Sequence, residues 1–176
     1  KMMTLLAIAA LVLAQAPAAQ ASPAPPFGHA GGYRYAFKTT TAHRPTNSTI
    51  GFYNGIVDAE GDTELASDWR VIGSTAADNA RDNTGTTLED SGATDVPIYN
   101  ALGEKIWDGN TEMWDGTTTP LMAMIRHIDG ANPTTGGDGQ RIWSGTNPDG
   151  TTDTGNELGA STVTRGIHAN TSAGHM

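Results

Sequence analysis

Glycine and proline interrupt this chain so often that only short helices and strands are expected. The 176 residues include 22 glycines and 9 prolines, a share above the average for these turn formers but below that of low-complexity sequences. The segments between them are rich in Thr, Asn and Asp, which also favour turns. We therefore predict one globular domain with short strands, one or two helices and long loops, large enough to bury one core.

Charge and cysteine content exclude several classes of protein. Ten Lys and Arg against 19 Asp and Glu give a formal net charge of −9, which repels phosphate backbones and anionic lipid. We therefore expect no nucleic-acid partner. The chain contains no cysteine, so disulfides, thiolate metal sites and cysteine nucleophiles are absent.

The first 32 residues are predicted to lie outside the folded domain. Residues 1–21 combine a basic start, an apolar run of about ten residues and the small-x-small sequence Ala19-Gln20-Ala21, which indicates a signal peptide cleaved after Ala21. That run is too short for a stable membrane span in the mature chain. Residues 22–32 are rich in Pro and Gly and are interpreted as a flexible arm. We therefore expect a secreted or cell-envelope protein.

Hydrophobic periodicity predicts the elements of the remaining domain. Residues 33–41 alternate apolar and polar side chains, as a half-buried strand does. Apolar residues between 50 and 57 have helical spacing, with Asn47 or Ser48 as the N-cap and Gly61 as terminator. Further predictions are strands at 69–73 and 140–144, a hairpin pairing 96–99 with 104–107, and a helical turn at 111–114 capped by Asn110. The run 121–128 is ambiguous, and its length and flanking turns favour a strand.

Three Asp-Gly steps, at 108–109, 115–116 and 149–150, have two interpretations, one of which is a calcium-binding site. The simpler interpretation is a set of turns, because Asp bonds its own backbone and Gly adopts positive φ. The alternative is a calcium site, since Ca²⁺ takes six to eight oxygen ligands from such loops. No segment has the spacing of an EF-hand loop, and no nucleophile elbow, paired-histidine zinc motif or phosphate-binding loop occurs.

Arg81 lies among short acidic and amide side chains in the sequence Asn79-Ala80-Arg81-Asp82-Asn83. A guanidinium paired with Asp78 or Asp115 would fix the long polar loop between residues 74 and 95, so a structural role is favoured over ligand contact. Structural roles are also expected for the tryptophans, which lie at junctions between elements, although an exposed one would be able to stack on a sugar. The structural set is Trp69, Arg81, Asp82, Trp114, Asp115 and Trp143.

Five segments in a fixed order carry a family resemblance. They are residues 69–75, 79–83, 96–103, 114–116 and 142–150, with the sequences WRVIGST, NARDN, VPIYNALG, WDG and IWSGTNPDG. The series resembles the C-type-lectin-like and endostatin-like domains of secreted bacterial proteins, some of the PEP-CTERM type, and covers residues 33–176. The resemblance implies an α+β fold with short antiparallel strands, and a closing strand beyond Met176, so that the domain would be truncated at its C-terminus.

The same resemblance implies a ligand site. In lectins of this fold a Glu-Pro-Asn or Gln-Pro-Asp tripeptide contacts calcium and sugar, and Asn147-Pro148-Asp149 is similar in form. Asn147, Asp149 and Asp153 are therefore the expected ligand-binding residues, with Asn147 and Asp149 as possible calcium ligands. The disulfides of many relatives are absent here.

These observations favour a noncatalytic module that binds carbohydrate or a cell-surface protein through its loops. One alternative is a calcium-stabilised adhesion domain. The other is a secreted hydrolase, which would need two carboxylates at catalytic separation in a concave site.

Overall fold

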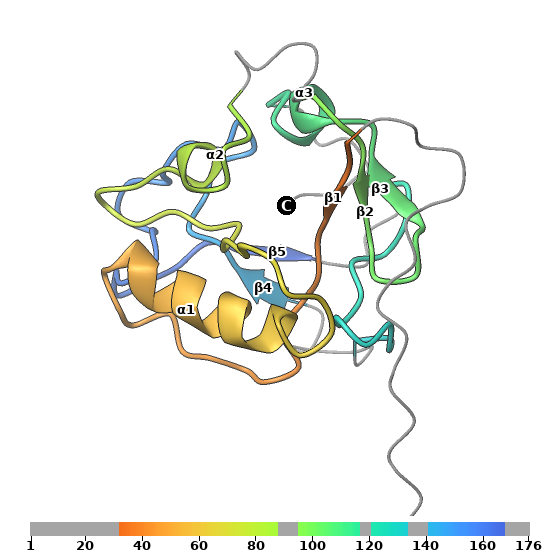
Figure 1. Ribbon diagram of the computed structural model, residues 1–176. Helices are drawn as coiled ribbons and strands as arrows, with labels where there is room; N and C mark the ends of the chain where they lie inside the picture. The colour runs from red at the N-terminus through yellow and green to blue at the C-terminus, as the bar shows by residue number, and fades with distance from the viewer. Residues whose placement is uncertain (1–31, 88–94, 117–120, 134–140, 168–176) are drawn as a thin grey trace, which may run out of the picture.

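The computed structural model describes residues 32–87, 95–116, 121–133 and 141–167. Within these ranges, three strands form one sheet in the order β1–β2–β3, and two more form a second sheet, β4–β5. Figure 1 shows helix α1 and the three-stranded sheet on opposite sides of the molecule, with β4 and β5 between them. The elements are β1 (Arg34–Tyr35), α1 (Ile50–Gly61), α2 (Ala80–Asn83), β2 (Ile98–Tyr99), β3 (Lys105–Trp107), α3 (Asn110–Met113), β4 (Arg141–Trp143) and β5 (Arg165–Ile167).

The α+β class is confirmed, with two differences in detail. Strand β1 pairs with β2 in parallel, whereas β2–β3 and β4–β5 are antiparallel as expected. The described residues contain three helices rather than one or two, because two of the three are four-residue turns. The likeness to C-type-lectin-like domains stays a prediction.

Strand β1 is shorter than the predicted strand at 33–41, although the chain stays extended beyond it. The backbone N–H groups of Arg34, Ala36 and Lys38 donate to carbonyl oxygens on one side at 2.7 to 3.0 Å, and Lys38 forms an isolated bridge with His127. The alternation places the small side chain of Ala36 in the core, where it is buried. Tyr33 and Tyr35 lie on the other face, with ring centroids 5.3 Å apart.

Helix α1 confirms the predicted helix but not its cap. The N-cap residue is Thr49, and Asn47 instead accepts a hydrogen bond from the Thr49 backbone N–H at 2.8 Å. Gly61 is the last helical residue, and the reason for glycine there is space. A Cβ on Gly61 would lie 2.5 Å from the indole of Trp69, so the absent side chain lets the ring pack against the helix end.

The segment 69–73 is not a strand, because side chains rather than a neighbouring strand satisfy its backbone. The Trp69 N–H donates to Asp58 at 3.1 Å and the Val71 N–H to the Asn54 carboxamide at 2.9 Å. The Asn83 carboxamide donates to the Val71 carbonyl at 2.9 Å. These bonds satisfy backbone groups that a neighbouring strand would otherwise pair, so no regular ladder forms.

The predicted hairpin is confirmed as β2–β3. Its turn closes with the Gly103 N–H on the Asn100 carbonyl at 2.9 Å, and Gly103 has a φ of 77°. The helical turn α3 follows, but its N-cap is Gly109. The Asn110 carboxamide instead accepts a bond from the Arg34 guanidinium at 2.6 Å, which ties α3 to β1.

The run 121–128 forms neither strand nor helix apart from the bridge at His127. It still contributes Leu121 and Ile125 to the core. An irregular segment can bury apolar side chains as a helix or strand does when its backbone polar groups find hydrogen-bond partners elsewhere. The predicted strand at 140–144 is confirmed as β4. The core cluster comprises Ala36, Ala80, Ile98, Ile106, Trp107, Met113, Trp114, Leu121 and Ile125.

Candidate functional site

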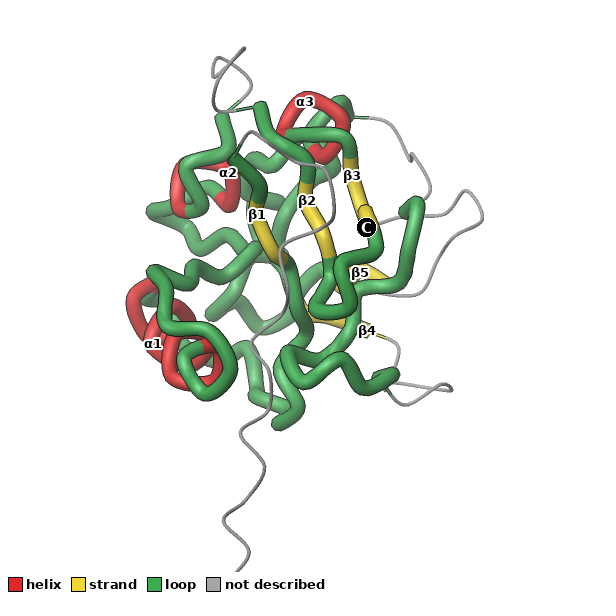
Figure 2. The backbone as a smooth tube through the Cα atoms, turned by 45° about the vertical axis from the view of Figure 1, so that its right-hand side comes forward, coloured by secondary structure: helices red, strands yellow, loops and turns green. Residues whose placement is uncertain are grey.

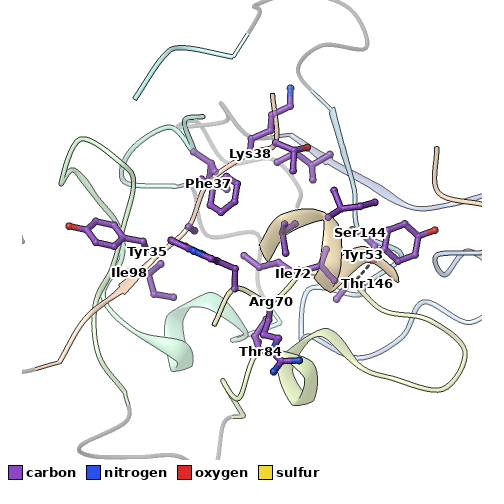
Figure 3. Close-up of a pocket in the computed structure, with 18 of the residues that line it drawn as sticks. Tyr35, Phe37, Lys38, Tyr53, Arg70, Ile72, Thr84, Ile98, Ser144 and Thr146 are labelled. Carbon is purple, nitrogen blue, oxygen red and sulfur yellow. Dashed lines mark hydrogen bonds between the residues drawn. The ribbon is translucent and has the colours of Figure 1, made fainter. Parts of the chain in front are cut away.

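A cleft of about 810 Å³ lies between β1, the 65–72 segment and β4, and we call it the β1–β4 cleft. Figure 3 shows Phe37, Ile72 and Ile98 around it, with Ser144 and Thr146 contributed from the β4 side. Interiors of folded proteins rarely leave voids larger than a water molecule. A cleft of this size with an apolar lining is therefore the candidate binding site.

Aromatic rings form one wall of the β1–β4 cleft. Phe37 and Trp69 meet edge to face, with centroids 5.0 Å apart. The Trp69 indole N–H donates to the Leu65 carbonyl at 2.9 Å, which fixes the ring while leaving it half-buried. These two side chains join the extended chain after β1 to the end of α1.

The backbone along this wall offers hydrogen-bonding groups as well as apolar surface. Because Arg34, Ala36 and Lys38 use their N–H groups toward β2 and Arg126, the alternation of an extended chain directs the Phe37 N–H and C=O the other way. Within the described residues neither backbone group of Phe37 has a hydrogen-bond partner. Among the described residues, this stretch is therefore an open strand edge.

Strand β4 presents a second edge to the same cleft, and among the described residues this edge has no partner strand. The Ser144 N–H donates to the Thr164 carbonyl at 3.0 Å, so Trp143 and Arg165 form a non-hydrogen-bonded pair of the antiparallel ladder. The backbone N–H and C=O of Trp143 then point away from β5. Trp143 and Ser144 both line the β1–β4 cleft, where the two-stranded sheet meets it. Figure 2 shows β4 and β5 below β2 and β3, as a sheet separate from the three-stranded one.

The charged side chains among the described residues that line the β1–β4 cleft are Arg34, Lys38, Asp68 and Arg70. Asp68 is the single carboxylate among the described residues that line it, and it pairs with Arg70 at 2.9 Å. Burial lowers the pKa of the Lys38 ammonium from its ordinary value. The His127 ring bonds the Lys38 carbonyl through Nδ1 at 2.9 Å. The described lining therefore contains no pair of carboxylates of the kind that glycoside hydrolysis requires.

The residues predicted to bind ligand are hydrogen-bonded within the polar loops, and Asn147 also lines the β1–β4 cleft. The Asn147 carboxamide donates to the Thr151 hydroxyl at 3.1 Å and to the Thr152 carbonyl at 3.0 Å. The Asp149 carboxylate accepts the Thr151 hydroxyl at 2.6 Å and its N–H at 3.0 Å. Hydrogen bonds from Thr151 lower the pKa of the Asp149 carboxyl, against an opposing effect of burial. Asp153 accepts a bond from the Thr164 hydroxyl.

Arg81 fixes the polar loop, but not through the acids expected from the sequence. Among the described residues it forms no ion pair with Asp78 or Asp115. Its guanidinium lies 3.5 Å from the Asp149 carbonyl oxygen, and its backbone N–H donates to the Gly150 carbonyl at 3.3 Å. The structure thus joins Arg81 to the turn at 149–150, across 68 residues of sequence.

Asp82 and Asp115 are both exposed. The Asp82 carboxylate accepts a hydrogen bond from the Asn79 carboxamide at 2.9 Å, within the start of α2. Among the described residues, no group of three or more His, Asp or Glu is placed to hold a metal ion.

The predicted structural tryptophans divide into three environments. Trp114 is buried, and its indole N–H donates to the Thr86 hydroxyl at 2.8 Å. Trp69 is half-buried at the cleft wall. Trp143 is 38% exposed, and the Arg165 guanidinium lies 4.8 Å from its ring centroid. Trp143 is thus the exposed tryptophan that a sugar-stacking role would require.

Sequence reasoning missed the backbone edges at Phe37 and Trp143. The alternating pattern at 33–41 indicates a strand, but it does not say which edge of that strand stays open. That information depends on long-range pairing with β2 and β5.

The described residues include no helix long and apolar enough to cross a membrane. Comparison with models of known protein families and with curated proteins finds no match to this chain.

Proposed function

We propose that this chain is a noncatalytic binding module that holds an extended, apolar segment of another protein in the β1–β4 cleft. The observation that carries the proposal is the pairing of an apolar lining with two open strand edges, at Phe37 and Trp143. An extended peptide supplies the main-chain hydrogen bonds that such edges lack, and its alternate side chains fill apolar pockets. The export signal predicted over residues 1–21 makes a cell-surface protein the expected partner.

The electrostatics of the β1–β4 cleft support an uncharged segment. The one described carboxylate of its lining is paired with Arg70, and Lys38 carries its charge at a cost of desolvation. An acidic peptide would meet the overall charge of −9, and a basic one would add a cation to a lining that already contains Arg34, Lys38 and Arg70.

Photo-crosslinking tests this proposal. Phe37 is replaced by a benzophenone-bearing phenylalanine, and the protein is irradiated with a library of six-residue peptides of defined sequence. We expect crosslinked peptides to be apolar and free of proline, because proline lacks the N–H that edge pairing needs. The matched control carries the same group at Phe52, which is exposed on α1 and does not line the cleft. Equal labelling from both positions would contradict the proposal.

Amide hydrogen exchange provides a second, independent test. In the free protein the N–H groups of Phe37 and Trp143 should exchange quickly, and a bound apolar peptide should protect both. Slow exchange at these two amides in the free protein would mean that the chain itself occupies the edges. The proposal of a partner strand would then be wrong.

Carbohydrate binding is a second candidate function, favoured by the exposure of Trp143. The Asn147–Asp153 turn gives it less support, because the side chains of Asn147, Asp149 and Asp153 are engaged within the loop.

A further inference from the structure

Several apolar side chains of the β1–β4 cleft are only half-buried, unlike those of the core beside them. Phe37, Leu65, Trp69, Ile72 and Ile142 belong to this set, and all five line the cleft. Ile72 and Ile142 also pack against the core cluster. Covering such surface with an apolar group is favourable through the same hydrophobic effect that forms the core. The lining therefore favours an apolar side chain contributed by the bound segment.

Two of these side chains are aromatic rings in a defined geometry. The Phe37 and Trp69 rings are nearly perpendicular, at 89°, with centroids 5.0 Å apart. In an edge-to-face pair the positive edge of one ring meets the negative face of the other, and a third ring can add further contacts of the same kind. An aliphatic side chain lacks this distribution of charge. The pair therefore favours an aromatic ring over an aliphatic group of the same size.

The position of the Trp69 ring is fixed before any ligand binds. Its indole N–H donates to the Leu65 carbonyl at 2.9 Å, and its backbone N–H donates to the Asp58 carboxylate at 3.1 Å. The ring lies against the end of α1, where a Cβ on Gly61 would come within 2.5 Å of it. A side chain held in this way has little freedom to lose when a ligand binds. Trp69 is thus a preorganised wall of the β1–β4 cleft.

Pairing at the Phe37 edge would itself place a partner's side chain beside this wall. In an antiparallel pair, residues directly opposite each other direct their side chains to the same face of the sheet, with Cβ atoms about 5 Å apart. A residue of the bound segment opposite Phe37 therefore meets the Phe37 ring, and through it the Trp69 ring. Aromatic residues opposite each other are among the favourable cross-strand pairs.

The charges of the lining are also compatible with a ring. Arg34, Lys38 and Arg70 line the cleft together with the single described carboxylate, Asp68. An aromatic ring has no net charge, and its negative face is attracted to cations. That attraction acts through the ring face and does not require a cation without other partners. A ring is therefore an apolar group that this lining accepts.

We propose that the segment bound in the β1–β4 cleft is anchored by one aromatic side chain, opposite Phe37 and packed against Phe37 and Trp69. This inference rests on the peptide-binding function proposed above and names the residue class that the cleft selects. A cleft of about 810 Å³ is large enough for a ring and the backbone that carries it.

Isothermal titration calorimetry of the whole chain with three blocked hexapeptides tests the anchor. The peptides share the sequence acetyl-Thr-Val-Thr-X-Thr-Val-amide, in which X is phenylalanine, cyclohexylalanine or alanine. Cyclohexylalanine has nearly the size of phenylalanine but no π system. We expect the phenylalanine peptide to bind about three- to tenfold more tightly than the cyclohexylalanine peptide, the size of an aromatic contact beyond area burial. The alanine peptide should bind more weakly than both, because it buries less apolar surface.

The outcomes separate this inference from the function on which it rests. Equal affinities for the phenylalanine and cyclohexylalanine peptides would overturn the aromatic anchor and leave an apolar peptide site. Equal affinities for all three peptides would overturn the anchor and leave backbone pairing alone. Binding of none of them would overturn the peptide-binding function as well.

Two variants locate the preference to the ring pair. Phe37→Leu and Trp69→Leu keep an apolar side chain, and in each the ratio of the phenylalanine to the cyclohexylalanine affinity should fall toward one. A ratio measured within one variant does not depend on the fraction of protein that is folded. Phe52→Leu is the matched control, because Phe52 is exposed on α1 and does not line the cleft, and it should keep the original ratio. An unchanged ratio in Phe37→Leu or in Trp69→Leu would overturn the assignment.

Discussion

The loops around Ser74 and the β1–β4 cleft satisfy their polar groups in contrasting ways. The Ser74 loops, defined as residues 74–87 and 144–158, bond side chain to backbone at almost every turn. The Ser74 hydroxyl accepts the Ala80 N–H at 2.9 Å and lies 3.0 Å from the Thr146 hydroxyl. The Thr152 hydroxyl reaches the Thr75 carbonyl at 3.0 Å. Along the cleft, by contrast, the Phe37 backbone groups have no partner among the described residues.

The difference separates a scaffold from a place to bind. A loop whose polar groups are satisfied internally has few left for a ligand, and the side chains of Asn147 and Asp149 are bonded within their own turn. An open edge beside apolar surface has its interactions still to make. Trp114 is buried against Thr86 and Gly150 of the Ser74 loops, whereas Trp143 is exposed on β4, and the first prediction compares them.

Trp114→Ala should cause the largest loss of stability. The ring is buried in the core and bonds Thr86, and truncation of a buried tryptophan costs about 3–5 kcal/mol. Trp143→Ala should cost less than about 1 kcal/mol, because the ring is exposed and loses mainly its contact with Arg165. Urea unfolding followed by circular dichroism measures both. Equal losses would remove the distinction between scaffold and site.

Ser74→Ala should destabilise the protein by about 1–3 kcal/mol. The substitution leaves the N–H of Ala80, a fully buried residue, without its acceptor. Ser67→Ala is the matched control, because Ser67 is exposed and its hydroxyl bonds nothing in the described residues. Thermal unfolding of the two variants gives the comparison. A Ser74 variant as stable as the control would show that the loops do not depend on this bond.

Glycines of α1 should respond in opposite directions. Gly51→Ala and Gly55→Ala should each stabilise the protein by about 1 kcal/mol, because both positions are open to solvent and alanine is the better helix former. Gly61→Ala should destabilise it by about 1 kcal/mol or more, since the added Cβ meets the Trp69 ring at the cleft wall. Chemical denaturation measures all three. Stabilisation by Gly61→Ala would contradict the packing described for Trp69.

Local patterns were sufficient to predict α1, the β2–β3 hairpin and β4. Each depends on neighbours in sequence, such as the helical spacing of Ile50, Tyr53 and Ile56 or the glycine at 103. The prediction of a strand at 69–73 was wrong for a different reason. Its backbone partners, Asn54, Asp58 and Asn83, come from distant positions, and an alternating pattern does not reveal them.

The candidate site was harder to predict for the same reason. Asn147-Pro148-Asp149 suggested a ligand site through its likeness to a lectin tripeptide, but the positions of Thr151 and Thr152 determine where those polar groups bond. The open edges at Phe37 and Trp143 arise only when β1 pairs with β2 and β4 with β5. The tryptophan at 143 was noted, while its pairing with Arg165 required the register of the second sheet.

Acid should loosen the Ser74 loops by a small amount through Asp149. Hydrogen bonds from Thr151 lower the pKa of Asp149 below that of an unfolded aspartate, which is about 4. The stabilisation is therefore complete above about pH 4 and is lost as pH falls through the lowered folded-state pKa. Thr151→Val should remove part of this dependence. A melting temperature that falls equally in both proteins between pH 5 and pH 3 would assign the acid sensitivity to other groups.

Millimolar calcium should leave the melting temperature unchanged, the smallest effect expected here. Calcium takes six to eight oxygen ligands, whereas the Asp149 carboxylate is bonded to Thr151 and Asp153 to Thr164. A cation would have to displace these internal donors before gaining its own contacts. Melting with EDTA and with 5–10 mM CaCl₂, about the excess that stabilises a millimolar site, decides the matter. A rise in melting temperature with CaCl₂ that is lost in Asp149→Asn would restore the calcium-stabilised adhesion domain as the better account. The contrast between the Ser74 loops and the β1–β4 cleft would then apply only to the metal-free protein.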